Sequence, residues 1–199
     1  MKKRNKGNNM VPGSGYQPPT PNLIVEPLIL YDMTCPKGIH AFCAQLDASP
    51  FQRETIMKYA AAIHELFMDM THKISEGLGI KNVSFEGWPC QFRFNKYCFT
   101  PETIGSTGVP SHTDTYFLTI LQDDENVNGL EVMNKSGQFV AVESWPNSLL
   151  VNMGDVTKAW SNGRFNNVKH RVICKQGKTR VSIASFIRIQ LWNPTSTCG

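Results

Sequence analysis

The fold class is decided by a stretch in the middle of the chain, QFRFNKYCF, residues 91–99. Its side chains alternate, with two phenylalanines on one face and Arg93, Asn95 and Tyr97 on the other. A period of two indicates a β-strand, because successive side chains of a strand point to opposite faces. The hydrophobic period changes from 3.6 to 2 at this point, so we predict a sheet for the second half of the chain.

The residues before this stretch predict helices. Ser49 can cap a helix, Pro50 suits the first helical position, and Gln52 can complete a capping box. Apolar residues then recur at steps of three and four as far as Leu78, which gives one buried stripe. A shorter helical segment is expected before it, from Thr34-Cys-Pro to Leu46.

The residues after this stretch predict further short strands separated by turns. Helices followed by many short strands favour a mainly β fold, a sandwich or barrel with helical support on one side. The expected strands cover residues 111–122, 130–133, 138–142, 148–153, 167–174 and 179–187.

The charge of the chain gives no sign of a nucleic-acid-binding face. Of the 20 Lys and Arg residues, four lie between Lys2 and Lys6, and the remaining 16 balance the 16 acidic residues. The formal net charge of +4 therefore belongs to the N-terminal tail. A nucleic-acid partner would need basic residues clustered on a folded surface, so none is expected.

We also expect no membrane partner and a cytoplasmic location. The apolar run from Leu23 to Leu30 is interrupted by Glu26 and Pro27, is too short to span a bilayer, and follows no signal-peptide layout. The six cysteines include no C-x-x-C pair. In a chain of this length such cysteines predict free, mostly buried thiols in a reducing compartment.

Three residues are candidate metal ligands. His112 and Asp114 lie two residues apart on a predicted strand, so their side chains should leave the same face. His170 comes after Asp114 with 55 residues between them, on another predicted strand. Two imidazoles and a carboxylate form the facial ligand set of non-haem Fe(II) oxygenases, which leaves coordination sites open. Taken separately, His112 and Asp114 could be a polar pair at a turn, and His170 a core histidine with its hydrogen bonds satisfied.

A candidate carboxylate-binding pair follows the second histidine. Arg180 and Ser182 begin the next predicted strand and share one of its faces. A guanidinium binds a carboxylate through two charge-assisted hydrogen bonds, and a hydroxyl can add a third donor. An inward-pointing, unpaired Arg180 would be costly, and a dicarboxylate cosubstrate would satisfy it.

In combination these motifs resemble the Fe(II)- and 2-oxoglutarate-dependent dioxygenase superfamily, most closely the plant dioxygenases for auxin oxidation. The resemblance covers roughly residues 13–187. The similar stretches are residues 88–97, 111–124, 129–132, 149–155 and 160–172.

The resemblance implies a role for each of these residues. His112, Asp114 and His170 would bind Fe(II), while Arg180 and Ser182 would bind the far carboxylate of 2-oxoglutarate. Tyr97 would also contact the cosubstrate, with Asn95 nearby, although a core tyrosine is the alternative for Tyr97. The implied fold is a double-stranded β-helix, or jelly-roll, with an N-terminal helix packed on the sheet.

The same resemblance implies a reaction, and two alternative functions stay open. The implied reaction uses O₂ and 2-oxoglutarate to oxidise a small aromatic acid, indole-3-acetate, to 2-oxindole-3-acetate. The chain lacks most of the family's N-terminal helical region and diverges after Phe186, so we expect a truncated member. One rival is therefore a catalytically weak relative that binds iron, 2-oxoglutarate or a partner. Another is a different metal-dependent jelly-roll protein, such as a cupin-type isomerase.

We accordingly expect four parts in the chain. These are a flexible basic tail over residues 1–22, a partial helical support region over 23–88, the dioxygenase core over 89–187, and a divergent tail over 188–199.

Overall fold

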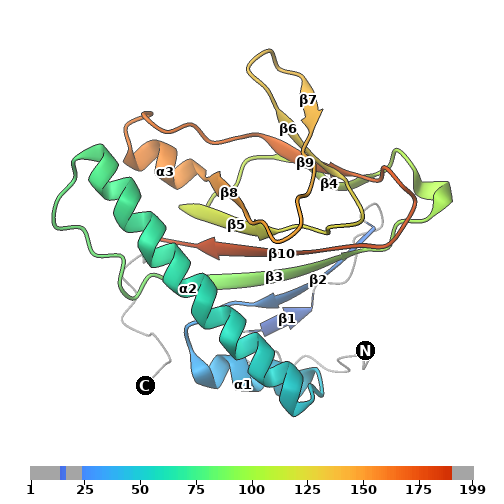
Figure 1. Ribbon diagram of the computed structural model, residues 1–199, viewed down its shortest axis with the longest axis horizontal. Helices are drawn as coiled ribbons and strands as arrows, with labels where there is room; N and C mark the ends of the chain where they lie inside the picture. Colours follow the sequence, from blue (N-terminus) through green and yellow to red (C-terminus); the bar gives the residue numbers. More distant parts are fainter. Residues whose placement is uncertain (1–13, 17–23, 190–199) are drawn as a thin grey trace. The chain divides into compact units, whose positions relative to one another are not determined.

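The computed structural model describes residues 14–16 and 24–189 (Figure 1). Strand β1, Ser14–Tyr16, lies in a segment for which no element was predicted. The other residues of the two predicted tails, apart from 188 and 189, lie outside the described residues. Among the described residues, one compact unit holds 14–15, 29–92 and 185–189, and a second holds 16, 24–28 and 93–184. Every predicted site residue belongs to the second unit.

The first unit contains the two predicted helices. Helix α1 spans Pro36–Gln45 and helix α2 spans Pro50–Leu78. The predicted capping box of α2 is confirmed, because the Ser49 and Gln52 side chains each accept from the other residue's backbone N–H. Helix α1 lies beside the first turns of α2 (Figure 1). Buried α2 side chains include Ile63 and Phe67, members of the predicted apolar stripe.

In the described part of the chain ten strands form two sheets, which confirms a mainly β fold with few helices. The six-stranded sheet has the order β1-β2-β3-β10-β5-β8, and the four-stranded sheet has the order β4-β9-β6-β7. Strands β4–β9, β5–β8, β6–β7 and β6–β9 pair antiparallel. The bounds of the strands after β1 are Val25–Leu30 for β2, Cys90–Tyr97 for β3, Thr107–His112 for β4, Leu118–Gln122 for β5, Leu130–Met133 for β6, Phe139–Ala141 for β7, Leu150–Met153 for β8, His170–Ile173 for β9 and Arg180–Ile187 for β10.

The predicted strand over residues 111–122 is wrong, because it is two strands joined by a loop at 113–117. The backbone of this loop is bound by the start of helix α3, Asp155–Trp160, instead of by a neighbouring strand. The Asp155 amide donates to the Asp114 carbonyl at 2.7 Å, and the Gly154 amide donates to the Phe117 carbonyl at 3.1 Å. A turn was predicted at Gly154-Asp155, whereas Gly154 is the N-cap of a helix.

The core of the second unit is apolar and lies between residues far apart in the sequence. Its buried members are Val25, Tyr97, Phe99, Leu130, Val172 and Cys174.

Four cysteines bear out the expectation of free thiols: Cys43, Cys90, Cys98 and Cys174. Burial raises the pKa of Cys90 to about 12, with Asp32 adding to the shift, so this thiol is unreactive. For Cys35 the expectation is wrong, since this residue is disulfide-bonded. Among the helices of the described residues, none is long and apolar enough to cross a membrane.

Candidate functional site

The two histidines of the predicted triad lie opposite each other on paired strands. His112 is the last residue of β4 and His170 is the first residue of β9. The antiparallel register makes them direct partners, and their ring centroids are 4.3 Å apart. Two residues separated by most of the sheet-forming sequence are therefore brought together by strand pairing alone.

Asp114 completes the triad from the loop after β4, whereas the sequence placed it on the strand. Its Oδ1 atom lies 3.6 Å from Nε2 of His112 and 3.7 Å from Nε2 of His170. One ligand atom from each of the three residues lies within 4.8 Å of the others. The convergence predicted from the His-x-Asp spacing is present, although a loop and not strand parity produces it.

The backbone fixes the tautomer of both imidazoles. Nδ1 of His112 lies 2.8 Å from the Pro110 carbonyl, and Nδ1 of His170 lies 3.2 Å from the Val168 carbonyl. A carbonyl oxygen only accepts, so each Nδ1 carries the proton and donates. The Nε2 lone pairs consequently face the Asp114 carboxylate, which is the orientation that metal binding requires.

The charges at the site are strongly coupled. The protonated imidazole of His112 would donate to Asp114, and this interaction raises the pKa of His112, while burial opposes that shift. Burial acts to raise the pKa of Asp114, but hydrogen bonds from His112, Thr119 and Asn152 and the nearby His170 hold it below its usual range. Asp114 is thus an ionised carboxylate, 7% exposed, with no Lys or Arg among these partners.

This donor set fits a divalent transition metal. It offers two neutral imidazole nitrogens and one carboxylate oxygen on one side of a common point, as in a facial triad. An ionised, buried carboxylate facing two lone pairs is unfavourable without a cation, so a metal ion would relieve it.

The four remaining predicted site residues form a second cluster, on β3 and β10. The Asn95 amide donates to the Ser182 hydroxyl at 3.4 Å. The guanidinium carbon of Arg180 lies 4.6 Å from the centre of the Tyr97 ring. All four side chains are buried. The strand parity that placed Asn95 and Tyr97 on one face is therefore consistent with the structure.

Arg180 has a protein partner that the sequence analysis did not identify. Its Nη2 atom donates to Oδ1 of Asp123, just beyond the end of β5. Burial raises the pKa of Asp123, and the Arg180 charge opposes that shift. Nε and Nη1 of Arg180 have no hydrogen-bond partner in the described part of the chain, although the residue is 1% exposed. Two buried donors therefore remain for an anionic ligand.

Two further residues at the metal site were missed. Thr119 and Asn152 both donate to Oδ2 of Asp114, at 2.7 and 2.8 Å. A signal for them exists in the sequence, because each is a polar residue inside an apolar strand. Such a residue, when buried, needs a hydrogen-bond partner.

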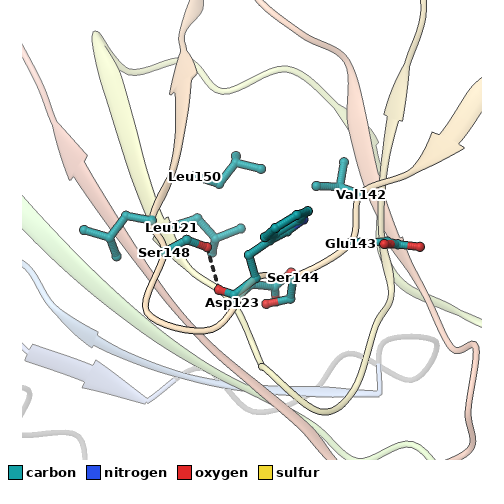
Figure 2. A pocket seen from close by; sticks show the side chains of 9 residues that line it. Leu121, Asp123, Val142, Glu143, Ser144, Ser148 and Leu150 are labelled. Atoms are coloured by element: carbon teal, nitrogen blue, oxygen red, sulfur yellow. Dashed lines mark hydrogen bonds between the residues drawn. The ribbon is translucent and has the colours of Figure 1, made fainter.

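A separate hollow of about 400 Å³ lies at the edge of the second unit (Figure 2). Among the predicted and missed site residues only Asp123 borders it. Trp145 is 72% exposed and lines this hollow, and the Ser148 hydroxyl donates to the Trp145 carbonyl. The hollow is therefore distinct from the metal-ligand cluster.

Comparison with known proteins adds a family. Residues 88–189 match the family model of the 2OG-Fe(II) oxygenase superfamily. This span includes all seven predicted site residues. The 2-oxoglutarate-dependent dioxygenase DAO of Oryza sativa subsp. indica is 50% identical over 188 residues, covering 94% of this chain and 62% of the relative. The chain thus spans less than two thirds of that relative's length.

Two solved structures are also similar. The dioxygenase for auxin oxidation 1 from Arabidopsis thaliana, in its binary complex with 2-oxoglutarate, superposes with a TM-score of 0.86 and 50% identity, covering 92% of this chain and 70% of that one. The dioxygenase for auxin oxidation in rice gives a TM-score of 0.82 and 51% identity, covering 89% and 60%.

Proposed function

Because this chain belongs to the 2OG-Fe(II) oxygenase superfamily, we propose that it is an Fe(II)- and 2-oxoglutarate-dependent dioxygenase that oxidises a small aromatic acid. The proposed substrate is indole-3-acetate and the proposed product 2-oxindole-3-acetate. One observation carries the proposal. The structure holds a converging His112, Asp114 and His170 triad in the same unit as a buried Arg180 with two unpaired donors.

The site residues form two sets, one that would bind the metal and one that would bind the cosubstrate. Nε2 of each histidine and Oδ1 of Asp114 would bind Fe(II). Arg180 would bind the far carboxylate of 2-oxoglutarate through its free Nε or Nη1 donors. Together they would satisfy the Asp114 charge, which has no Lys or Arg partner, and the two Arg180 donors that have no partner in the described part of the chain.

Two residues would orient the cosubstrate carboxylate. The Ser182 hydroxyl already accepts from Asn95, so its own proton is free to donate to a carboxylate. The Tyr97 ring contacts the Arg180 guanidinium and limits the positions it can take. We assign Tyr97 this role on the face of the guanidinium, in place of the direct contact with the cosubstrate that the resemblance implies.

The oxidative chemistry comes from bound Fe(II) and 2-oxoglutarate, and the chain contributes binding and orientation. The balance of the reaction is indole-3-acetate, 2-oxoglutarate and O₂ giving 2-oxindole-3-acetate, succinate and CO₂. One oxygen atom enters the indole ring and the other enters succinate. Indole-3-acetate as substrate is supported by the 50% identity to proteins named for auxin oxidation.

The strand orders support a double-stranded β-helix. In chain order β3, β5, β8 and β10 belong to one sheet, while β4, β6, β7 and β9 belong to the other. The chain therefore passes repeatedly between the sheets, as a jelly-roll requires. Packing of helix α2 on the sheet is supported by Tyr59, whose ring centroid lies 5.4 Å from that of Phe92 on β3.

The proposal is tested in two steps with the purified chain. The first is an anaerobic titration with Fe(II) and then 2-oxoglutarate, which should give a metal-to-ligand charge-transfer band. A chain that binds Fe(II) but gives no band with 2-oxoglutarate would contradict the dioxygenase assignment and favour another metal-dependent jelly-roll protein.

The second step measures succinate released in air with and without indole-3-acetate. Succinate formation that depends on indole-3-acetate supports the substrate. A charge-transfer band without such turnover would instead indicate a relative that binds iron and 2-oxoglutarate but is catalytically weak. The matched control is His112→Ala, which removes one metal ligand and should abolish both the band and turnover.

We further propose a cytoplasmic location and a small-molecule substrate as the main partner. Four of the five described cysteines, Cys43, Cys90, Cys98 and Cys174, are free thiols, which supports a reducing compartment, whereas the disulfide at Cys35 argues against one. A fluorescent fusion expressed in plant cells tests the location, and signal confined to the secretory pathway would contradict it.

A further inference from the structure

The two carboxylate oxygens of Asp114 have different surroundings. Oδ1 faces Nε2 of His112 and of His170 at 3.6 and 3.7 Å. Oδ2 accepts two hydrogen bonds, from the Thr119 hydroxyl at 2.7 Å and the Asn152 amide at 2.8 Å. One oxygen is therefore satisfied by the protein, and the other is left for a ligand.

The two donors form a matched pair on a rigid part of the fold. Thr119 on β5 and Asn152 on β8 are direct cross-strand partners, so their side chains leave the same face of the sheet. They are 5% and 9% exposed, and Asp114 is 7% exposed. Because each of these donors would be buried without a partner if Asp114 turned away, the arrangement favours a single carboxylate orientation.

The backbone of Asp114 is fixed by the start of helix α3, which directly follows β8. The Asp155 amide donates to the Asp114 carbonyl at 2.7 Å. Gly154, the N-cap of this helix, permits this approach, since a Cβ atom there would lie 1.9 Å from the Tyr116 carbonyl oxygen. Strand β8 and the start of α3 thus hold both the main chain and one carboxylate oxygen of Asp114.

We infer that Thr119 and Asn152 are positioning residues that hold Asp114 as a one-oxygen ligand of the metal. With Oδ2 committed to two hydrogen bonds, Asp114 offers only Oδ1 to the ion. One carboxylate oxygen and two imidazole nitrogens leave three of six octahedral positions open. A carboxylate binding through both oxygens would occupy one of these. The inference rests on the metal site of the proposed function.

The test is Co(II) binding to the purified full chain, followed by visible absorption. Thr119→Val keeps the shape of the side chain and removes its donor, while Thr119→Ser keeps the donor. Asn152→Ala removes the second donor. We expect Thr119→Val and Asn152→Ala each to raise the Co(II) Kd by about 10- to 100-fold. Thr119→Ser should stay within about threefold of wild type, since it keeps the hydroxyl.

Thr71→Val is the matched control. Thr71 is equally buried, and its hydroxyl donates to the Met68 carbonyl within helix α2. The same loss of a hydroxyl should leave the Co(II) Kd unchanged there, whatever it does to the melting temperature. The Co(II) spectrum gives a second readout, because release of Oδ2 changes the coordination and hence the d–d bands, which loss of stability alone does not.

The outcomes separate this inference from the proposed function. If the wild type binds Co(II) and Thr119→Val binds it equally well with an unchanged spectrum, the positioning role is overturned while the metal site stands. If the wild type binds neither Co(II) nor Fe(II), the metal site fails and the inference fails with it. Weaker Co(II) binding by Thr119→Val, together with near-wild-type binding by Thr119→Ser, supports the inference.

Discussion

Two buried carboxylates of the second unit, Asp114 and Glu131, are satisfied in opposite ways. Both Glu131 oxygens are bound by cations. Arg171 contacts Oε2 through Nη2 at 2.7 Å, and Lys175 binds Oε1. Asp114 has neutral donors on one oxygen and two histidines facing the other. Glu131 is 5% exposed and Asp114 7%, so burial does not distinguish them.

The difference separates a structural group from a functional one. The Glu131 charge is compensated within the fold, and its partner Arg171 also contacts the Phe139 ring at 3.9 Å. No Lys or Arg is among the described side chains that interact with the Asp114 charge, so it remains available to attract a metal ion. A buried carboxylate marks a metal site only when its charge is left for an ion to balance.

The largest effect expected from this contrast is on metal affinity. Asp114→Ala removes one of three ligands and should raise the Co(II) Kd by more than about 100-fold. This increase is larger than the one expected when a single hydrogen bond to Asp114 is lost. Glu131→Gln should leave the Co(II) Kd within about twofold, since this group contacts no ligand atom. Isothermal titration with Co(II) measures both. Equal losses in the two variants would mean that the contrast between the carboxylates is wrong.

A smaller effect is expected at two arginines, the buried Arg180 and the partly exposed Arg171. Arg180→Lys loses the planar fork and should raise the Kd of 2-oxoglutarate by about tenfold in the anaerobic Fe(II) protein. The matched control is Arg171→Lys. The wild-type Arg171 guanidinium binds Glu131 and contacts the Phe139 ring, so this substitution should leave the Kd of 2-oxoglutarate unchanged. The charge-transfer band gives both Kd values. An unchanged Kd in Arg180→Lys would remove this residue from the cosubstrate site.

The sequence predicted the ligands but not what holds them. Strand periodicity and the resemblance identified His112, Asp114 and His170, because ligand identity is written in residue type and spacing. The Asp114 loop was not predicted, since it depends on backbone bonds from Asp155, 41 residues away. Asp123 was missed for the same reason, as only the folded chain brings it to Arg180.

The bounds of helices and strands were likewise predictable only where local contacts set them. The capping box at Ser49 fixed the start of α2 locally, and that prediction is confirmed. The strand predicted over 111–122 was wrong because Thr, Tyr and Phe favour strands by type, whereas the tertiary bonds of this segment impose a loop.

The smallest expected effect is the pH dependence that the Glu131 carboxylate gives to the free energy of unfolding. The bond from Lys175 lowers the pKa of Glu131 below its ordinary value of 4.5, with Arg171 assisting and burial opposing. A carboxyl with a lowered pKa in the folded state stabilises the fold above its unfolded pKa, and this stability is lost as the pH falls through the folded value. Glu131→Gln should therefore reduce the free energy of unfolding by about 1 kcal/mol at pH 7.

That difference should shrink as the pH falls below about 4.5, because a protonated Glu131 resembles glutamine in charge and shape. The cations are 36% and 41% exposed, which keeps the whole effect modest because water screens such pairs. Urea unfolding of wild type and Glu131→Gln at about pH 7, 5 and 3.5 measures the change. A difference that stays constant down to the lowest pH would mean that Glu131 stabilises the sheet by packing, and that its charge is no better compensated than that of Asp114.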